Sequence, residues 1–215
     1  MCVENKIASC VFKLFIAAVG TLALTYAAGL WNGTFNPRFL CMFTNISNLA
    51  VTAYFWCAAI MILRGSAGAC SPWRHKLKYA LMLAITVTWL VAHFLLDWGM
   101  VFQGDAFHPE MLVLHYIVPI CTIIDWLVFD QKGSMSYKDV LAWPLFPLGY
   151  VVYICVLVAG FGVVALDDGT RWPYPFLNFD ALGPLVLANI VGLLAAFMLI
   201  GCLYVFVDRM LAKRR

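Results

Sequence analysis

Charge is scarce in this sequence: only 12% of the 215 residues are Asp, Glu, Lys or Arg, whereas 64% are hydrophobic. A soluble domain carries about 25% charged residues, so the composition excludes an ordinary soluble protein. The formal net charge of +3 comes from Lys and Arg residues that flank apolar runs, which argues against a nucleic-acid-binding surface. The mean hydropathy of +0.90 indicates an integral membrane protein.

The sequence also lacks the short motifs that bind nucleotides or metals. It contains no GxGxxG, no GxxxxGK[ST], no HExxH and no CxxC. The eight cysteines therefore do not suggest a disulfide framework, and we expect no cofactor. Five cysteines lie in or beside apolar runs, and we expect them to be buried free thiols: Cys10, Cys57, Cys121, Cys155 and Cys202.

Six long apolar runs dominate the chain. The alternating ten-residue patterns of barrel strands are absent, so we expect the runs to be helices. We expect them at about residues 11–31, 43–63, 77–98, 110–129, 140–164 and 181–207. Each run is long enough to cross a hydrocarbon core of about 30 Å at about 1.5 Å per residue. No linker could hold a second domain, so residues 1–215 are predicted to form one all-α, six-helix transmembrane domain.

The cations fall mainly on one side of the predicted spans. Twelve of the 14 Lys and Arg residues, Lys13 and Lys78 among them, flank the spans on the side of the two termini; only Arg38 and Arg171 lie on the other side. The positive-inside rule therefore places both termini in the cytoplasm. We expect a multi-pass protein of the plasma membrane or of a bacterial inner membrane. The first span resembles a signal peptide, but its 17-residue apolar stretch exceeds a usual signal core, and we expect it to be retained.

Polar side chains from four predicted helices converge on the outer leaflet. Thr44 lies roughly 5 Å into the second span, and His115 lies roughly 8 Å into the fourth. His93 and Asp97 end the third span at the same level, and Asn189 lies about two turns into the sixth span. Because ionisable residues inside a bilayer are costly, this convergence indicates a functional site.

The local patterns around Thr44 and His115 sharpen this expectation. Thr44, Asn48 and Thr52 follow one another at i, i+4 and i+8, which predicts a polar stripe on one helix face. Pro119 has no N–H to donate to the carbonyl of His115, so we expect a kink beside the imidazole.

These residue types suggest a hydrolase. A threonine hydroxyl becomes a nucleophile when a base takes its proton, and His115 is the natural base for Thr44. Backbone amides near Asn45 and Ser47, at the start of the helix, could stabilise an oxyanion, and the Asn48 side chain could add a donor. The pattern predicts a carboxylic ester hydrolase acting on a lipid ester. The same position also suits a simple N-cap role for Thr44.

Two other classes of function stay open. His93 and Asp97, spaced i, i+4, could bind zinc together with His115 or His108 and so form a metal-dependent hydrolase. Alternatively, the polar cluster could bind or transport lipid without chemistry, although the sequence shows no inverted repeat. Arg171 suits a lipid headgroup or a substrate carboxylate. The sequence makes no prediction of the oligomeric state.

Three segments resemble landmarks of a known family: FLCMFTNISNLAVTAYF, LHYIVPICTIIDWLVFD and DDGTRWPYPFLNFD. They are similar to the helix-opening threonine, the later histidine followed by proline, and the G-x-x-W-x-Y-P loop of the androgen-induced family. That family includes the androgen-dependent TFPI-regulating protein and bacterial six-helix relatives, and the chain looks closest to the bacterial branch. The animal members are intramembrane threonine hydrolases of fatty acid esters of hydroxy fatty acids. The resemblance implies that Thr44 is the nucleophile and His115 its partner base.

Overall fold

The computed structural model describes residues 5–65, 72–97 and 108–213, and these residues form helices and connecting turns without a strand. Six helical stretches are long and apolar enough to cross a membrane, which confirms the predicted all-α, six-helix architecture. They are Lys6–Ala27, Phe43–Leu63, Trp73–Leu96, Pro109–Phe129, Tyr137–Gly160 and Leu185–Ala212.

Several of these stretches combine an α-helix with a π-helical segment. The first two are α1 (Lys6–Ala27) and α2 (Phe43–Leu63). The third joins α3 (Pro72–Val91) to η4 (Ala92–Asp97), and the fourth joins α4 (Pro109–Leu112), η6 (Val113–Ile117) and α5 (Val118–Phe129). The fifth contains α6 (Tyr137–Val140), α7 (Leu145–Cys155) and η7 (Val156–Gly160), and the sixth is α9 (Leu185–Ala212). The connections contain η1 (Leu30–Asn32), η2 (Pro37–Cys41), η8 (Pro175–Leu177) and α8 (Phe179–Leu182).

The predicted ends are right for the second and fourth spans and need correction elsewhere. The first span begins at Lys6, because the Asn5 side chain accepts a hydrogen bond from the Ala8 amide and caps the helix. The third begins at Pro72, because the cationic segment that follows it is helical rather than part of the loop. The sixth begins only at Leu185, because Gly183 has a positive φ and Pro184 then starts the helix.

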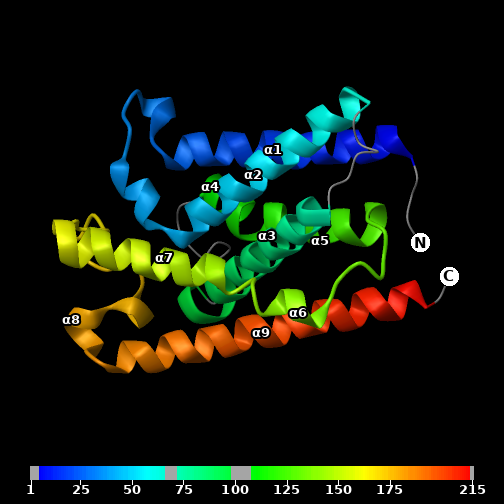
Figure 1. The fold of residues 1–215 in the computed structure, drawn as a ribbon. Coiled ribbons are helices and arrows are strands. Elements are labelled where there is room, and N and C mark those ends of the chain that lie inside the picture. Colours follow the sequence, from blue (N-terminus) through cyan, green and yellow to red (C-terminus); the bar gives the residue numbers. More distant parts are fainter. Residues whose placement is uncertain (1–4, 66–71, 98–107, 214–215) are drawn as a thin grey trace.

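The chain termini and the connection between α1 and α2 lie at opposite ends of the bundle. Figure 1 shows both termini at one end, here called the terminal end, and the α1–α2 connection and α8 at the other, here called the distal end. An even number of spans requires this arrangement of the termini. Their cytoplasmic location stays a prediction from the charge distribution.

The helices pack closely at a few small residues and expose apolar side chains outward. A Cβ atom on Gly20 of α1 would lie 2.4 Å from the Thr52 hydroxyl of α2, so only glycine allows this approach. On α9, Leu187, Val191 and Leu199 are all exposed. An apolar surface of this kind suits contact with lipid rather than water.

The cysteines are free, as predicted, in the part of the chain that the structure describes. Their expected burial is only partly right. Cys10 is buried, whereas Cys57 and Cys202 are exposed, and Cys121 and Cys155 are half-buried. Apolar runs in a membrane helix bundle face lipid as well as the core, so an apolar neighbourhood in the sequence does not fix burial.

Candidate functional site

Thr44 and His115 meet at the distal end of the bundle. The Thr44 Oγ1 atom lies 3.2 Å from His115 Nε2, although the two residues are 71 positions apart. Thr44 comes from the first turn of α2 and His115 from η6, and His115 is buried. Catalytic proton transfer needs about 3 Å between heavy atoms, so the pair has the geometry of a nucleophile and its base.

The simple N-cap role for Thr44 is wrong. Met42 is the N-cap of α2 and makes no side-chain capping bond, and Thr44 is the second residue inside the helix. Its hydroxyl therefore faces another helix instead of the free amides of its own. The Thr44 backbone N–H donates to the Tyr174 hydroxyl at 3.4 Å.

The segment that carries His115 is a widened, π-helical turn. Val113–Ile117 is π-helical, and the Val118 N–H donates to the Val113 carbonyl, five residues back. Pro119 cannot donate to the His115 carbonyl, and this widened turn precedes it. π-Helical turns occur frequently at functional sites, because they reorient side chains locally.

Asn48 links α2 to η6 instead of offering a free donor. Its Nδ2 atom donates to the Thr44 carbonyl at 2.8 Å and to the Leu114 carbonyl at 3.0 Å. Both amide hydrogens are thereby used, so the prediction of an oxyanion donor at Asn48 is wrong. Leu114 directly precedes His115, and this bridge between α2 and η6 fixes the register of the pair. Asn48 is completely buried, so the bridge is protected from solvent.

Of the backbone amides expected as oxyanion donors, those of Asn45 and Ile46 both donate to the Met42 carbonyl. The Asn45 backbone N–H donates to the Met42 carbonyl at 3.1 Å, and its side chain donates to the Phe39 carbonyl at 2.9 Å. The Ser47 hydroxyl donates to the Thr44 carbonyl and lies 3.0 Å from the Thr88 hydroxyl. These residues tie the start of α2 to its surroundings.

Tyr174 is a site residue that the reasoning from depth missed. It lies in the WPYP loop, its ring stacks on Phe176 with 5.1 Å between centroids, and its hydroxyl accepts the Thr44 N–H. Burial raises the pKa of Tyr174, so the hydroxyl keeps its proton and can donate it. The only signal in the sequence was its place in the family-like G-x-x-W-x-Y-P segment.

A pocket with a cavity volume of about 80 Å³ adjoins Thr44. Its walls come from α2, α3, η4, α7, η8 and α9, and apart from Thr44, Thr88, Tyr150 and Tyr174 they are apolar or proline. A mostly apolar lining with a few polar groups is typical of small-molecule sites. A second pocket shares Leu96, Phe176 and Leu193 with the first and reaches Asn189, whose side chain donates to the Phe176 carbonyl.

Among the side chains that the structure describes, the remaining predicted site residues do not form a metal centre. His93 Nδ1 lies 3.0 Å from the Tyr116 hydroxyl, and His108 lies beside Glu110 at the exposed start of α4. The Asp97 side chain lies outside the described residues. Within the described ranges, no three His, Cys, Asp or Glu side chains lie close enough together to hold a metal ion.

Arg171 lies apart from Thr44 and His115. Its guanidinium is 3.4 Å from Asp180 and donates to the Val158 carbonyl at 3.1 Å. Its side chain is 44% exposed. Arg171 therefore braces the loop that carries Tyr174 rather than touching Thr44 or His115.

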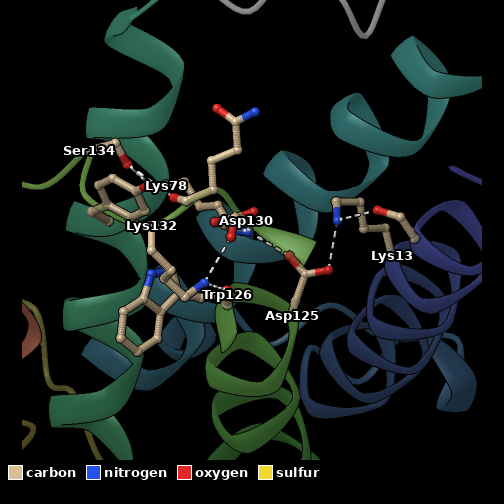
Figure 2. A network of polar contacts seen from close by, with 10 residues as sticks. Lys13, Lys78, Asp125, Trp126, Asp130, Lys132 and Ser134 are labelled. Atoms are coloured by element: carbon tan, nitrogen blue, oxygen red, sulfur yellow. Dashed lines mark hydrogen bonds and ion pairs between the residues drawn. The ribbon is translucent and has the colours of Figure 1, made fainter. Parts of the chain in front are cut away.

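A second buried polar cluster lies in the terminal half of the bundle. Figure 2 shows the Asp125 carboxylate between two lysines, 2.7 Å from Lys13 Nζ and 2.5 Å from Lys78 Nζ. Lys78 also lies 2.6 Å from Asp130. The expectation that Lys13 and Lys78 flank the spans is wrong, because both are buried inside the bundle. This cluster links α1, α3 and α5 through opposite charges.

No protein-family model, no curated protein and no solved structure matches the chain. The resemblance to the androgen-induced family stays a prediction from three sequence segments.

Proposed function

We propose that the protein is an intramembrane ester hydrolase that uses Thr44 as its nucleophile and His115 as its general base. The observation that carries the proposal is the 3.2 Å separation between Thr44 Oγ1 and His115 Nε2 at the edge of an apolar pocket. An ionisable side chain buried inside a membrane helix bundle is costly and often functional, and activation of the neighbouring hydroxyl is a function that suits His115.

The reaction follows from the two side chains. Thr44 Oγ1 attacks the ester carbonyl carbon while His115 Nε2 takes the hydroxyl proton, which gives a tetrahedral oxyanion. The oxyanion collapses, the bond to the alkoxy oxygen breaks, and that oxygen takes the proton from His115 and leaves as an alcohol. Water then attacks the acylated Thr44 with His115 as its base. The fatty acid leaves, and the Thr44 oxygen regains a proton.

Tyr174 is the donor that best fits the oxyanion. Its hydroxyl oxygen accepts the Thr44 N–H, so the hydroxyl lies beside the proposed nucleophile and can donate to an oxyanion that forms there. The high pKa of Tyr174 keeps that hydrogen in place. One such donor typically contributes about 10² to 10³-fold to kcat.

The proposed substrate is a lipid ester. The pocket beside Thr44 is lined mostly by apolar side chains, and the bundle exposes apolar side chains to its surroundings, so a substrate dissolved in the bilayer can approach laterally. The predicted orientation puts the site in the outer leaflet. The three family-like segments suggest fatty acid esters of hydroxy fatty acids or similar lipids as the first compounds to test.

The proposal is tested with purified protein in lipid nanodiscs and a fatty acid ester of a hydroxy fatty acid. Release of free fatty acid is measured by mass spectrometry. We expect Thr44→Ala to abolish release, His115→Gln to lower it by about 10² to 10⁴-fold, and Thr44→Ser to retain part of it. Thr52→Ala is a matched control on the same face of α2, two turns deeper.

Two results would contradict the proposal. If Thr44→Ala hydrolyses the ester as fast as the unmodified protein does, Thr44 is not the nucleophile. Recovery of intact ester with the protein after long incubation, without free fatty acid, would instead support a lipid-binding or transport protein.

A further inference from the structure

The pocket and His115 lie on different sides of Thr44. Thr44 lines the pocket together with residues of α3, α7 and α9, whereas its hydroxyl faces His115 on η6. No residue of α1, α4, η6 or α5 lines the pocket. Thr44 therefore stands between the base and the pocket.

This placement distinguishes the two halves of an ester. When the tetrahedral intermediate collapses, the alkoxy oxygen must receive its proton from His115 Nε2, so the alcohol half faces η6. The acyl chain is attached to the same carbon and is directed away from the leaving oxygen. The space available on that side of Thr44 is the apolar pocket.

We infer that the pocket binds the acyl chain of the ester, and that Val87 and Phe197 at its far end limit the length of that chain. The inference rests on the proposed hydrolase activity and states which part of the substrate the pocket selects, namely the acyl chain.

The pocket has an elongated shape along the helices. On α3 and η4 its lining extends from Leu96 to Val87, nine positions that correspond to about 13 Å of helix. On α9 it extends from Ile190 to Phe197, or about 10 Å. A lining of this length is longer than an acetyl group needs and fits a longer acyl chain.

The far end of the pocket is closed by the core of the bundle. Phe197 is 1% exposed, and besides lining the pocket it belongs to the buried cluster that contains Trp143 and Tyr204. Beyond Phe197 the interior is filled by these aromatic side chains. An acyl chain that reaches Phe197 can therefore go no further without displacing core residues.

The inference predicts a specific length profile. Each buried methylene adds about fourfold to kcat/KM, which corresponds to about 0.8 kcal/mol. The value of kcat/KM should rise by this factor with each added carbon until the acyl chain reaches Phe197, and then level off or fall. Lengthening the alcohol half should produce no such limit.

The test uses two series of esters, one that varies the acyl chain at a constant alcohol and one that varies the alcohol at a constant acyl chain. We expect Val87→Phe to move the optimum to shorter acyl chains, and Phe197→Ala to move it to longer ones. Leu194→Phe provides a second shortened pocket if Val87→Phe does not fold. Val191→Phe, the same change on the exposed side of α9, should leave both profiles unchanged.

The outcomes separate this inference from the proposed function. If hydrolysis does not depend on Thr44, the proposed function fails. If hydrolysis depends on Thr44 but the folded pocket variants change the alcohol profile, or leave the acyl profile unaltered, the hydrolase stands and the assignment of the acyl chain to the pocket is overturned.

Discussion

Replacement of Asp125 by Asn should strongly destabilise the bundle. The Asp125 carboxylate is completely buried and makes two ion pairs, with Lys13 on α1 and Lys78 on α3. Asp125→Asn keeps the shape of the side chain but removes the negative charge that both lysines face. Breaking a buried pair by removing one partner typically costs about 3 to 5 kcal/mol, because the remaining charge is left without compensation.

This loss is large enough to measure by thermal unfolding in detergent. For a protein of this size, about 1 kcal/mol lowers Tm by about 2 to 4 °C, so Asp125→Asn should lower Tm by about 6 to 20 °C. The matched control is Asp180→Asn, which removes an exposed partner of Arg171 and should cost about 0 to 1 kcal/mol. Equal Tm values for the two variants would refute the view that the Asp125 cluster stabilises the bundle.

Two further variants test a packing contact between α1 and α2 and the role of the Tyr174 hydroxyl. Gly20→Ala should lower the free energy of unfolding by about 1 to 3 kcal/mol, because the new Cβ would lie 2.4 Å from the Thr52 hydroxyl. Gly192→Ala, with open space around it, should leave that free energy unchanged or raise it, and a larger loss there would contradict the packing argument. Tyr174→Phe should lower kcat by about 10²-fold in the ester assay if its hydroxyl stabilises the oxyanion. The control is Tyr153→Phe, which removes a hydrogen bond to the Leu40 carbonyl. Equal kcat values for these two variants would show that the Tyr174 hydroxyl does not stabilise the oxyanion.

The six spans could be predicted because a membrane imposes a length on every apolar helix. The meeting of Thr44 and His115 could also be predicted, since residues at the same depth on neighbouring helices have a restricted set of partners. The actual contact depends on which faces of α2 and η6 turn toward each other. Asn48 sets this orientation by bonding to the Thr44 and Leu114 carbonyls, and backbone carbonyls leave no signature in a sequence.

The contacts that could not be predicted are those that loops and interhelical packing create. Tyr174 reaches Thr44 from a connecting loop between α7 and α9, where no helical periodicity relates it to α2. The sequence predicts Lys13 as a flanking cation because lysine is costly inside a bilayer. Its burial becomes acceptable only beside Asp125, 112 positions away, and nothing in the sequence pairs these two residues.

The most direct test of the central claim is covalent labelling of Thr44. The purified protein is treated with a fluorophosphonate probe, and the modified residue is identified by mass spectrometry. We expect a phosphonate adduct on Thr44 that is absent from Thr44→Ala and strongly reduced in His115→Gln. Labelling that persists in Thr44→Ala, or an adduct on the neighbouring Ser47 instead, would contradict the assignment of Thr44 as the nucleophile.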